Sequence, residues 1–464
     1  MSVKKLVQEA LGDLGKEQKP TYNAGFSNLC DVVLNDNEPR FLTFDGEVVD
    51  QAMIDDVLLQ PPPLTGWPPY LKIPRAKKVL NYAQNHGVSG ENGVSGVCKG
   101  CTHLFYNLVK YHQEVSELPN NDLYYLLALW DFHTYLIEKA NYSPIIYFFS
   151  VAERGKSRTL KGMTYVAFRG IRKGDIRDAQ LLRDCTHLRA TLAFDMTDFW
   201  EKVKVSGSQD VILNRYERGT TVSRVNRPDK GAFRDTDFYD VFGPTILATN
   251  EVISDIADTR SIPIVMRKAD RDFDNDITPE SGLDFKEQLT AFRLVHFKDE
   301  LPKVMRIAKS RLGDIVSPLH QILLKIVPKE EERFINLIKN IEKTRLTEKA
   351  STIDAEIIQA WVKAQDTVIN GVIASQKVAD AFNQEREERD KLNSRKVGSR
   401  LSSFGFSKTQ TNNHTLGFIA DDLLTEKLVK EYGVYPLGTT ETPDNPETKE
   451  KFVAEVEKGL NEIL

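Results

Sequence analysis

The tripeptide Gly155-Lys156-Ser157 is the part of the chain whose residue types and spacing point most directly to chemistry. The segment 143–149, SPIIYFF, is short, apolar and rich in β-branched and aromatic residues, which predicts a buried strand. The segment 159–168 can continue as a helix. A strand, a tight loop that ends in Gly-Lys-Ser and a helix form the context of a phosphate-binding loop (P-loop), in which backbone N–H groups and the helix N-terminus face an anion.

The ligand expected at this loop is ATP with Mg²⁺. Lys156 would reach the β- and γ-phosphates, and the Ser157 hydroxyl would coordinate the metal. The usual pattern, G-x-x-x-x-G-K-[ST], has a glycine where this chain has Ser150, and serine adopts positive φ less readily than glycine. A chance Gly-Lys-Ser in a surface turn is the alternative. The predicted nucleotide-binding residues are Glu153, Arg154, Gly155, Lys156, Ser157 and Arg158.

A second apolar segment, 188–194, leads into Asp195. A carboxylate at the carboxyl end of a strand beside the P-loop can hold Mg²⁺ directly or through water, so Ser157 and Asp195 are the predicted metal ligands. The alternative for Asp195 is the N-cap of the next helix. Most ATPases of this type have a glutamate after the aspartate, which polarises the attacking water. Here Met196 stands in that place and Asp198 is the nearest substitute carboxylate, so the rate of hydrolysis is left open.

Two further polar residues flank predicted strands downstream. The apolar segment 245–248 leads to Asn250, which is placed as a sensor that orients water near the γ-phosphate; an ordinary asparagine turn is the alternative. Arg260 precedes another short strand. In oligomeric ATPases an arginine there can stabilise transition-state charge at the nucleotide of a neighbouring subunit, whereas the alternative is a surface arginine paired with a nearby aspartate. The predicted catalytic residues are Asp195, Asp198, Asn250 and Arg260.

Two cysteines and a histidine lie close together before the predicted core. Cys98, Cys101 and His103 have the spacing of half a zinc site. No second CxxC or HxxxH follows at a matching distance, and Cys30 and Cys185 could contribute only through distant folding. We therefore interpret the pair as plain thiols near a helix start, and metal binding by them stays open.

The segment 208–224 carries three arginines, Arg215, Arg218 and Arg224, and a charged loop is predicted at 229–240. We expect these arginines to contact DNA or a neighbouring subunit. A solvated surface is the alternative.

Two helices and a hairpin are predicted near the end of the chain. The helices lie at 374–382 and 394–404, and the hairpin lies at 407–419 with its turn at Asn412-Asn413. This order is typical of a winged helix, whose second helix can lie in a DNA major groove. A winged helix that contacts protein instead is the alternative. The predicted DNA-binding residues are Arg395, Lys396, Arg400 and Lys408, and His414 is also placed to touch phosphate.

The composition limits the class of protein. At ~150 residues each, 464 residues allow about three domains, and a chain that is 41% hydrophobic and 28% charged can build its core without disulfides. The net charge of −5 means that DNA contacts must come from local basic patches. There is no apolar run of about 18 residues and no apolar signal segment, so we expect a cytoplasmic protein with no membrane contact.

These elements predict an α/β fold with a P-loop NTPase core built on a mainly parallel sheet, a helical subdomain and a C-terminal winged helix. A helix at 122–140, apolar on nearly all faces, leads directly into the strand before the P-loop. The predicted parts are an N-terminal region of uncertain fold at 1–97, the ATPase core with its preceding helices at 98–280, the helical subdomain at 281–368, the winged helix at 369–435, and a polar tail with a terminal helix at 436–464.

The chain resembles the P-loop ATPases (AAA+ or helicase-like) encoded by plasmids, phages and integrative elements, which are often joined to primases and described as primase–helicase or replication proteins. The resemblance spans about Leu104 to Gly433. It implies a homo-oligomer, hexameric in similar ATPases, with ATP at the subunit interfaces, single-stranded or forked DNA as a partner, and a separate primase. The segments that carry it are ALWDFHTYL, SPIIYFFSVAERGKSRTL, TLAFDMTDFW, ILNRYERGTTVSR, VFGPTILATN, DTRSIPIVMRK and SRKVGSRLSSFGF.

Three functional hypotheses follow. The first is an ATP-dependent DNA helicase or translocase of a mobile element. The second is a nucleotide-switched DNA-binding or helicase-loader protein with slow hydrolysis, for which Met196 is the sequence argument. The third is a non-catalytic interaction protein that retains a decayed P-loop.

Overall fold

A computed structural model of the chain describes residues 21–87, 98–251, 255–384, 386–411 and 415–434. The predicted turn at Asn412-Asn413, His414 and the predicted terminal helix lie outside the described residues. The chain divides into two compact units, Met1–Lys339 and Asn340–Leu464, and each is described by itself. The boundary falls inside the segment 281–368.

The first unit is built on a five-stranded sheet in which every neighbouring pair is parallel, which confirms the mainly parallel sheet of the predicted α/β fold. The strand order is β13-β7-β12-β9-β8. The strands are β7 (Ile145–Phe149), β8 (Ile171–Lys173), β9 (Leu192–Asp195), β12 (Thr245–Thr249) and β13 (Ser261–Val265). The central strands are almost wholly buried, because helices cover both faces of a parallel sheet and favour continuous apolar runs.

The strands end nearly level with one another. Ala248 of β12 pairs with Phe148 of β7 and with Asp195 of β9, and Val265 of β13 pairs with Phe149. Because the strands are parallel, the segments that follow β7, β9, β12 and β13 all gather at one edge of the sheet. Open parallel sheets bind ligands at this edge.

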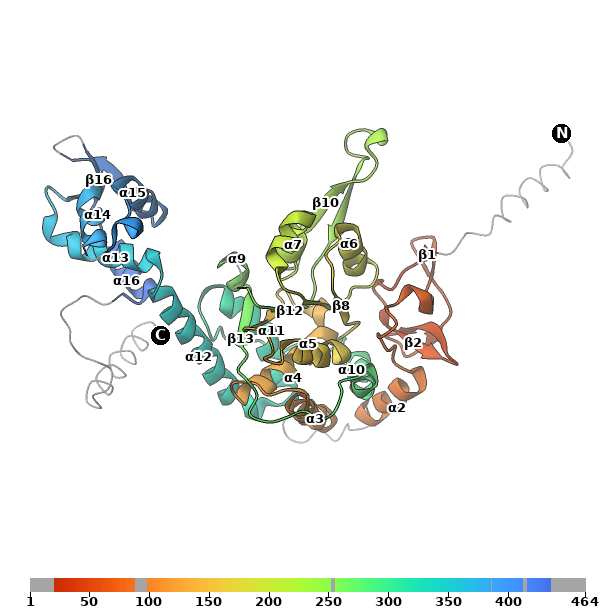
Figure 1. The fold of residues 1–464 in the computed structure, drawn as a ribbon. Coiled ribbons are helices and arrows are strands. Elements are labelled where there is room, and N and C mark those ends of the chain that lie inside the picture. The colour runs from red at the N-terminus through yellow and green to blue at the C-terminus, as the bar shows by residue number, and fades with distance from the viewer. Residues whose placement is uncertain (1–20, 88–97, 252–254, 385, 412–414, 435–464) are drawn as a thin grey trace, which may run out of the picture. The chain divides into compact units, whose positions relative to one another are not determined.

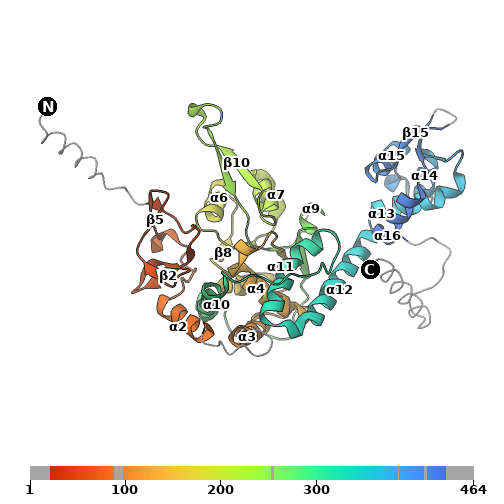
Figure 2. The ribbon, with the colours of Figure 1, turned by 180° about the vertical axis from the view of Figure 1, so that it is seen from behind.

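Helices pack on both sides of this sheet. In Figures 1 and 2, α6 and α7 flank the base of the arm that contains β10 (Thr221–Val225), while α3 lies at the opposite end of the unit. Helix α4 is buried around its circumference, as expected from its composition, and its Phe132 meets Phe292 of α10 edge-on with ring centroids 4.8 Å apart. The helices are α3 (Lys99–Val115), α4 (Asp122–Tyr135), α5 (Lys156–Val166), α6 (Asp178–Thr186), α7 (Phe199–Ser206), α8 (Gln209–Asn214), α9 (Asp255–Asp258), α10 (Leu283–His296) and α11 (Ser310–Ile326).

Strand β13 forms one edge of the sheet. The carbonyl of Arg260 and the N–H of Met266 are both bonded to the backbone of β7. Since alternate residues of a strand present their backbone polar groups to the same neighbour, the even-numbered residues of β13 face β7. The ring nitrogen of Pro263 therefore faces the open edge and has no hydrogen to donate.

An antiparallel hairpin projects from the sheet between β9 and β12 in the sequence (Figure 1). It consists of β10 (Thr221–Val225) and β11 (Thr236–Asp240), which pair over five residues. The charged loop predicted at 229–240 is therefore partly a strand. Alternate side chains of the hairpin are exposed on both strands, so it lacks the apolar pattern of a core strand.

The N-terminal part of the first unit shares its core with the sheet. Leu29, Val32 and Phe41 belong to the same apolar cluster as Leu192 and Phe194 of β9. The elements are β1 (Thr21–Tyr22), β2 (Leu29–Asn35), β3 (Glu38–Thr43), β4 (Val48–Val49), β5 (Ala52–Ile54), β6 (Val57–Gln60) and α2 (Ala76–Gly87).

The described part of the second unit contains α-helices packed with a three-stranded antiparallel sheet around its own core, and the strand order is β14-β16-β15. Trp361, Ile373, Val397 and Phe418 are fully buried there. Helix α12 (Glu331–Ala350) runs across the boundary between the units. The other elements are α13 (Ile353–Lys363), β14 (Val372–Ala374), α14 (Ser375–Asn383), α15 (Ser394–Ser403), β15 (Lys408–Gln410), β16 (Leu416–Ile419) and α16 (Asp422–Tyr432).

Among the described residues, no helix combines the length and the apolar character that crossing a membrane requires.

Candidate nucleotide-binding site

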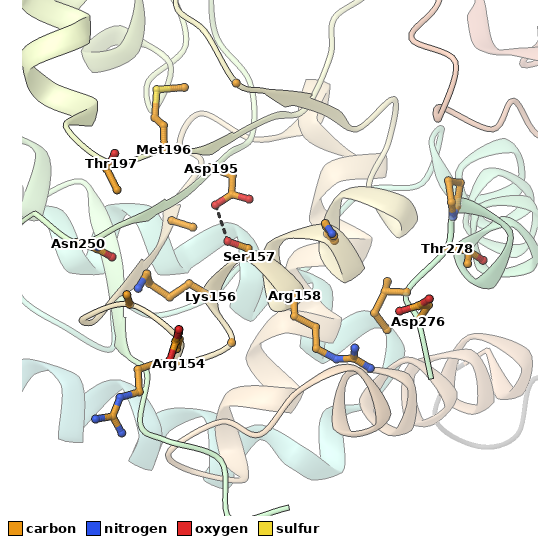
Figure 3. A pocket seen from close by; sticks show the side chains of 18 of the residues that line it. Arg154, Lys156, Ser157, Arg158, Asp195, Met196, Thr197, Asn250, Asp276 and Thr278 are labelled. Atoms are coloured by element: carbon orange, nitrogen blue, oxygen red, sulfur yellow. Dashed lines mark hydrogen bonds between the residues drawn. The ribbon is translucent and has the colours of Figure 1, made fainter. Parts of the chain in front are cut away.

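A pocket of about 1050 Å³ opens at the carboxyl edge of the sheet, where the loop after β7 faces the ends of β9 and β12 (Figure 3). Its basic side chains outnumber its acidic ones, which suits a polyanionic ligand. The basic residues are Arg154, Lys156, Arg158, Lys161 and Lys202, and the acidic ones are Glu153, Asp195 and Asp276.

The hydroxyl of Ser157 donates a hydrogen bond of 2.7 Å to Oδ1 of Asp195 (Figure 3). Ser157 is the second residue of α5 and Asp195 ends β9, so the parallel sheet brings together two residues 38 positions apart. A hydroxyl and a carboxylate at this spacing are the hard oxygen ligands that suit Mg²⁺. The donor set therefore fits the predicted metal.

The ammonium of Lys156 contacts the loop that follows β7. It donates to the carbonyl oxygens of Ser150 at 2.8 Å and Val151 at 2.6 Å, and to the Ser150 hydroxyl at 3.1 Å. Burial lowers the pKa of Lys156 from its ordinary value, and the nearby charge of Asp195 opposes that shift. A cation that is held by carbonyl and hydroxyl oxygens of the loop can exchange them for phosphate oxygens.

The turn of the loop falls on residues other than Ser150. The positive φ angles are those of Glu153, at 61°, and Gly155, at 80°, whereas Ser150 does not have positive φ. The position at which the P-loop pattern usually has its first glycine therefore accepts serine without strain. Gly155 directly precedes α5, so the N-terminus of this helix faces the pocket.

Asn250 lines the pocket and follows β12, the strand that lies between β7 and β9. In the strand order it therefore lies between the loop that follows β7 and Asp195. Met196 also lines the pocket and is buried. Asp198 is exposed, has a φ of 53° before α7 and is not among the residues that line the pocket.

Arg260 lies at the amino ends of the strands, whereas the pocket lies at their carboxyl ends. It precedes β13, and the next residue pairs with Ile145, the first residue of β7. Its guanidinium packs over the ring of Tyr216 at 4.6 Å, and its Nε and Nη1 are buried with no hydrogen-bond partner among the described residues. The structure does not bring Arg260 to the nucleotide pocket of its own chain.

The two arginines of the loop differ in their contacts. Arg158 lines the pocket, but its Nε donates to the carbonyl of Val115 at 2.6 Å and its Nη2 to that of Asn275 at 2.5 Å. It therefore braces α5 against α3. Arg154 is half-exposed, and its guanidinium points away from Ser157 in Figure 3.

The expectation that Arg215, Arg218 and Arg224 contact DNA or a neighbour is wrong for Arg215, which is fully buried. Its guanidinium donates to Thr245 Oγ1, Cys185 Sγ and the carbonyls of Ala190, Val241 and Pro244.

The other two arginines also have partners within the chain. Arg218 donates to the carbonyls of Ala140 and Ile137, each at 2.8 Å, and Arg224 forms ion pairs with Asp178 and Asp210. Sequence alone does not distinguish these structural arginines from surface cations, because their partners lie in distant segments.

The cations predicted to bind DNA lie in the second unit. Arg395 and Lys396 are exposed on α15, and Lys408 is exposed on β15. Arg400 is exposed as well, but it forms an ion pair with Asp354.

Some residues that line the pocket are not among the site residues predicted from the sequence. Lys161 is one turn beyond Ser157 on α5, and its position could have been read from the helix period. Lys202, Asp276 and Thr278 come from loops and a short helix, where no sequence pattern predicts which way a side chain points.

No protein-family model matches the chain, and no curated protein matches it. One apo structure of the C-terminal region of NrS-1 is 12% identical with a TM-score of 0.33, over 90% of this chain and 91% of that one. A second apo structure of that region is 11% identical with a TM-score of 0.36, over 90% of each chain. SCCmec type IV Cch, an active helicase, is 11% identical with a TM-score of 0.36, over 93% of this chain and 84% of that one. At these values the likeness carries no argument about fold or function.

Proposed function

We propose that the chain is an ATP-dependent DNA helicase or translocase, of the replication type found on mobile elements. The observation that carries the proposal is the contact between Ser157 and Asp195 beside the Lys156 ammonium. It supplies two oxygen ligands for Mg²⁺ and a cation for phosphate in one basic pocket.

Four of the residues that line the pocket then have proposed roles. Lys156 leaves the loop carbonyls and binds the β- and γ-phosphates, while Ser157 and Asp195 hold Mg²⁺. Asn250 orients the attacking water from the end of β12. When bound, Mg²⁺ neutralises charge that develops on the phosphates.

The DNA contacts are proposed at two places. The tip of the β10–β11 hairpin carries Phe233, whose side chain is fully exposed, between the exposed Lys230 and Arg234. An exposed aromatic ring beside cations suits stacking on unpaired bases. The second place is the winged helix that we assign to the second unit, because its element order is helix, strand, two helices and a two-stranded hairpin.

The assembly is proposed to be a homo-oligomeric ring, with a separate primase as partner, as the sequence resemblance implies. Arg260 can act at a neighbouring nucleotide only if its guanidinium leaves the Tyr216 ring. Size measurement with and without ATP tests the ring.

ATP hydrolysis with a DNA titration tests the main proposal. Lys156→Ala should reduce DNA-stimulated turnover by about 10²-fold or more, because it removes a cation that faces the transferred phosphate. Lys204→Ala is the matched control, since Lys204 is an exposed lysine of α7 outside the pocket lining. ATP binding without unwinding or translocation would reject the helicase. Failure of the wild type to bind Mg·ATP would reject the site and favour an interaction protein with a decayed P-loop.

A slowly hydrolysing, nucleotide-switched DNA-binding or loader protein is the second candidate. Met196 favours it, because this buried apolar side chain lines the pocket where a water-polarising glutamate is usual, and the substitute Asp198 lies outside the lining. On this hypothesis Met196→Glu should raise turnover at least about tenfold. Unchanged turnover, with Mg·ATP still bound, would weaken it.

A further inference from the structure

A cluster of three soft and borderline metal ligands lies away from the nucleotide pocket. The sulfurs of Cys98 and Cys101 and a ring nitrogen of His296 all lie within 4.8 Å of one another. Cys98 and Cys101 come from the start of α3, and His296 is the last residue of α10, 195 positions after Cys101. The histidine that the sequence pattern offered, His103, is exposed on α3 and is not in the cluster.

One pair of these donors has the spacing of two ligands in a tetrahedral zinc site. For Zn–S of about 2.3 Å and Zn–N of about 2.05 Å, two ligands at a tetrahedral angle lie about 3.5 Å apart for S and N. The distance from Cys101 Sγ to His296 Nε2 is 3.5 Å. The chain therefore already holds this edge of the tetrahedron.

The imidazole is held by a carboxylate on its other side. Nδ1 of His296 lies 2.8 Å from Oδ2 of Asp299, and the same oxygen accepts a hydrogen bond of 2.8 Å from Lys325 of α11. A carboxylate on Nδ1 fixes the tautomer that leaves Nε2 as the metal ligand, an arrangement typical of zinc-bound histidines.

The sulfur of Cys98 lies at the start of a helix. Cys98 is the N-cap of α3, a helix of 17 residues, and its sulfur accepts a hydrogen bond of 3.3 Å from the N–H of Cys101. A helix N-terminus and an N–H donor both stabilise a negatively charged sulfur.

We propose that Cys98, Cys101 and His296 bind one Zn²⁺ ion, with Asp299 as the residue that positions His296. Two thiolates and an imidazole favour zinc over the hard cations Mg²⁺ and Ca²⁺. Because Cys98 and His296 are only partly buried, water takes the fourth position. The interpretation of the two cysteines as plain thiols does not account for the histidine and carboxylate that the fold adds.

The ion would join the start of α3 to the end of α10. Near the opposite end of α3, the carbonyl of Val115 accepts the hydrogen bond from Arg158 of the P-loop helix. By fixing the start of α3, the ion would stabilise a helix that α5 contacts.

Zinc content and cobalt spectra of the full chain test the proposal. Wild-type protein reconstituted with Zn²⁺ and desalted should retain about one ion per chain. Cys98→Ser and His296→Gln should each retain less than about one-tenth of that amount, because each removes a ligand.

Co²⁺ added to the metal-free wild type should give the near-ultraviolet charge-transfer absorption of a thiolate–cobalt bond. This measurement does not depend on the folding of a variant. Chelation should lower the melting temperature of the wild type.

Two controls separate the site from general metal affinity. His103→Ala should keep its zinc, because His103 is on the same helix but outside the cluster. Asp299→Asn should bind at the same stoichiometry with about 10–100-fold weaker affinity, as expected for a positioning residue. The proposal is overturned if reconstituted wild type holds no zinc and gives no thiolate–cobalt band, if His103→Ala loses as much zinc as His296→Gln, or if the purified chain carries a Cys98–Cys101 disulfide.

Discussion

His133 is fully buried in α4, the helix that precedes the P-loop strand. Its Nε2 lies 2.9 Å from the Ser143 hydroxyl, and its Nδ1 has no hydrogen-bond partner among the described residues. Burial lowers the pKa of His133 to about 3. The folded chain therefore keeps this imidazole neutral, whereas the unfolded chain protonates it below its ordinary pKa of about 6.5.

This difference predicts acid sensitivity. Between pH 6.5 and 3 the unfolded state binds the additional proton, so the free energy of unfolding falls as pH falls, by about 1.4 kcal/mol per pH unit. At pH 5 the loss from His133 is about 2 kcal/mol relative to pH 7.5. His133→Gln should reduce the change in unfolding free energy between these two pH values by that amount, measured by urea unfolding. An equal pH dependence in wild type and variant would contradict the prediction.

The predictability of the site differs from residue to residue. It could be predicted that Lys156, Ser157, Asp195 and Asn250 line one pocket, because each lies at or after the carboxyl end of a strand and the parallel topology brings these ends together. His296 could not, since only the packing of α10 against α3 places it near the cysteines. Partners far apart in the sequence leave no local pattern.

At the scale of elements, the tip of the β10–β11 arm carries the residues that we propose to contact DNA. On the proposed function, Phe233→Ala should weaken binding of single-stranded DNA about tenfold, because base stacking on an aromatic ring is worth about 1–3 kcal/mol. Lys230→Ala should lower the slope of log affinity against log salt by about 0.7, the loss of one phosphate contact. Fluorescence anisotropy with labelled oligonucleotides at several salt concentrations measures both.

Phe238→Ala provides the control, because Phe238 is an exposed aromatic residue of the same arm but belongs to β11 rather than to the tip. Its affinity for DNA should stay within about twofold of the wild type. If Phe238→Ala and Phe233→Ala weaken binding equally, the tip is not a specific contact.

The core strands and the arm show why some elements are easier to predict than others. β7 and β12 are buried on both faces and appear in the sequence as short apolar runs. β11 pairs with β10 but has no fully buried residue, so its sequence is as polar as that of a charged loop. A strand without a buried face has no hydrophobic period to detect.

At the scale of the whole molecule, the two units have separate apolar cores. We therefore expect two transitions in calorimetry of the full chain. A nonhydrolysable Mg·ATP analogue at 100 times its dissociation constant should stabilise the Met1–Lys339 transition by about 2.7 kcal/mol and leave the other unchanged. Lys156→Ala should abolish that shift. A single transition, or an equal shift of both, would show that the units unfold together.

The first unit also includes its N-terminal strands, which the sequence leaves unassigned. Arg169 forms a buried ion pair with Asp31 of β2 at 2.8 Å and donates to the carbonyls of Ala24 and Leu188. Removal of the N-terminal strands would leave the buried charge of Arg169 without Asp31. We expect this to lower the free energy of unfolding by several kcal/mol.

The proline on β13 has a consequence for how copies of the chain can associate. Exposed strand edges invite pairing between molecules, which leads to open-ended aggregates. Pro263 is the middle residue of β13 and has no backbone N–H to donate at this edge. A strand from another copy therefore cannot complete a hydrogen-bonded ladder there. Copies of the chain that meet at this edge must therefore associate through side chains, and a continuous sheet cannot extend from one copy to the next across β13.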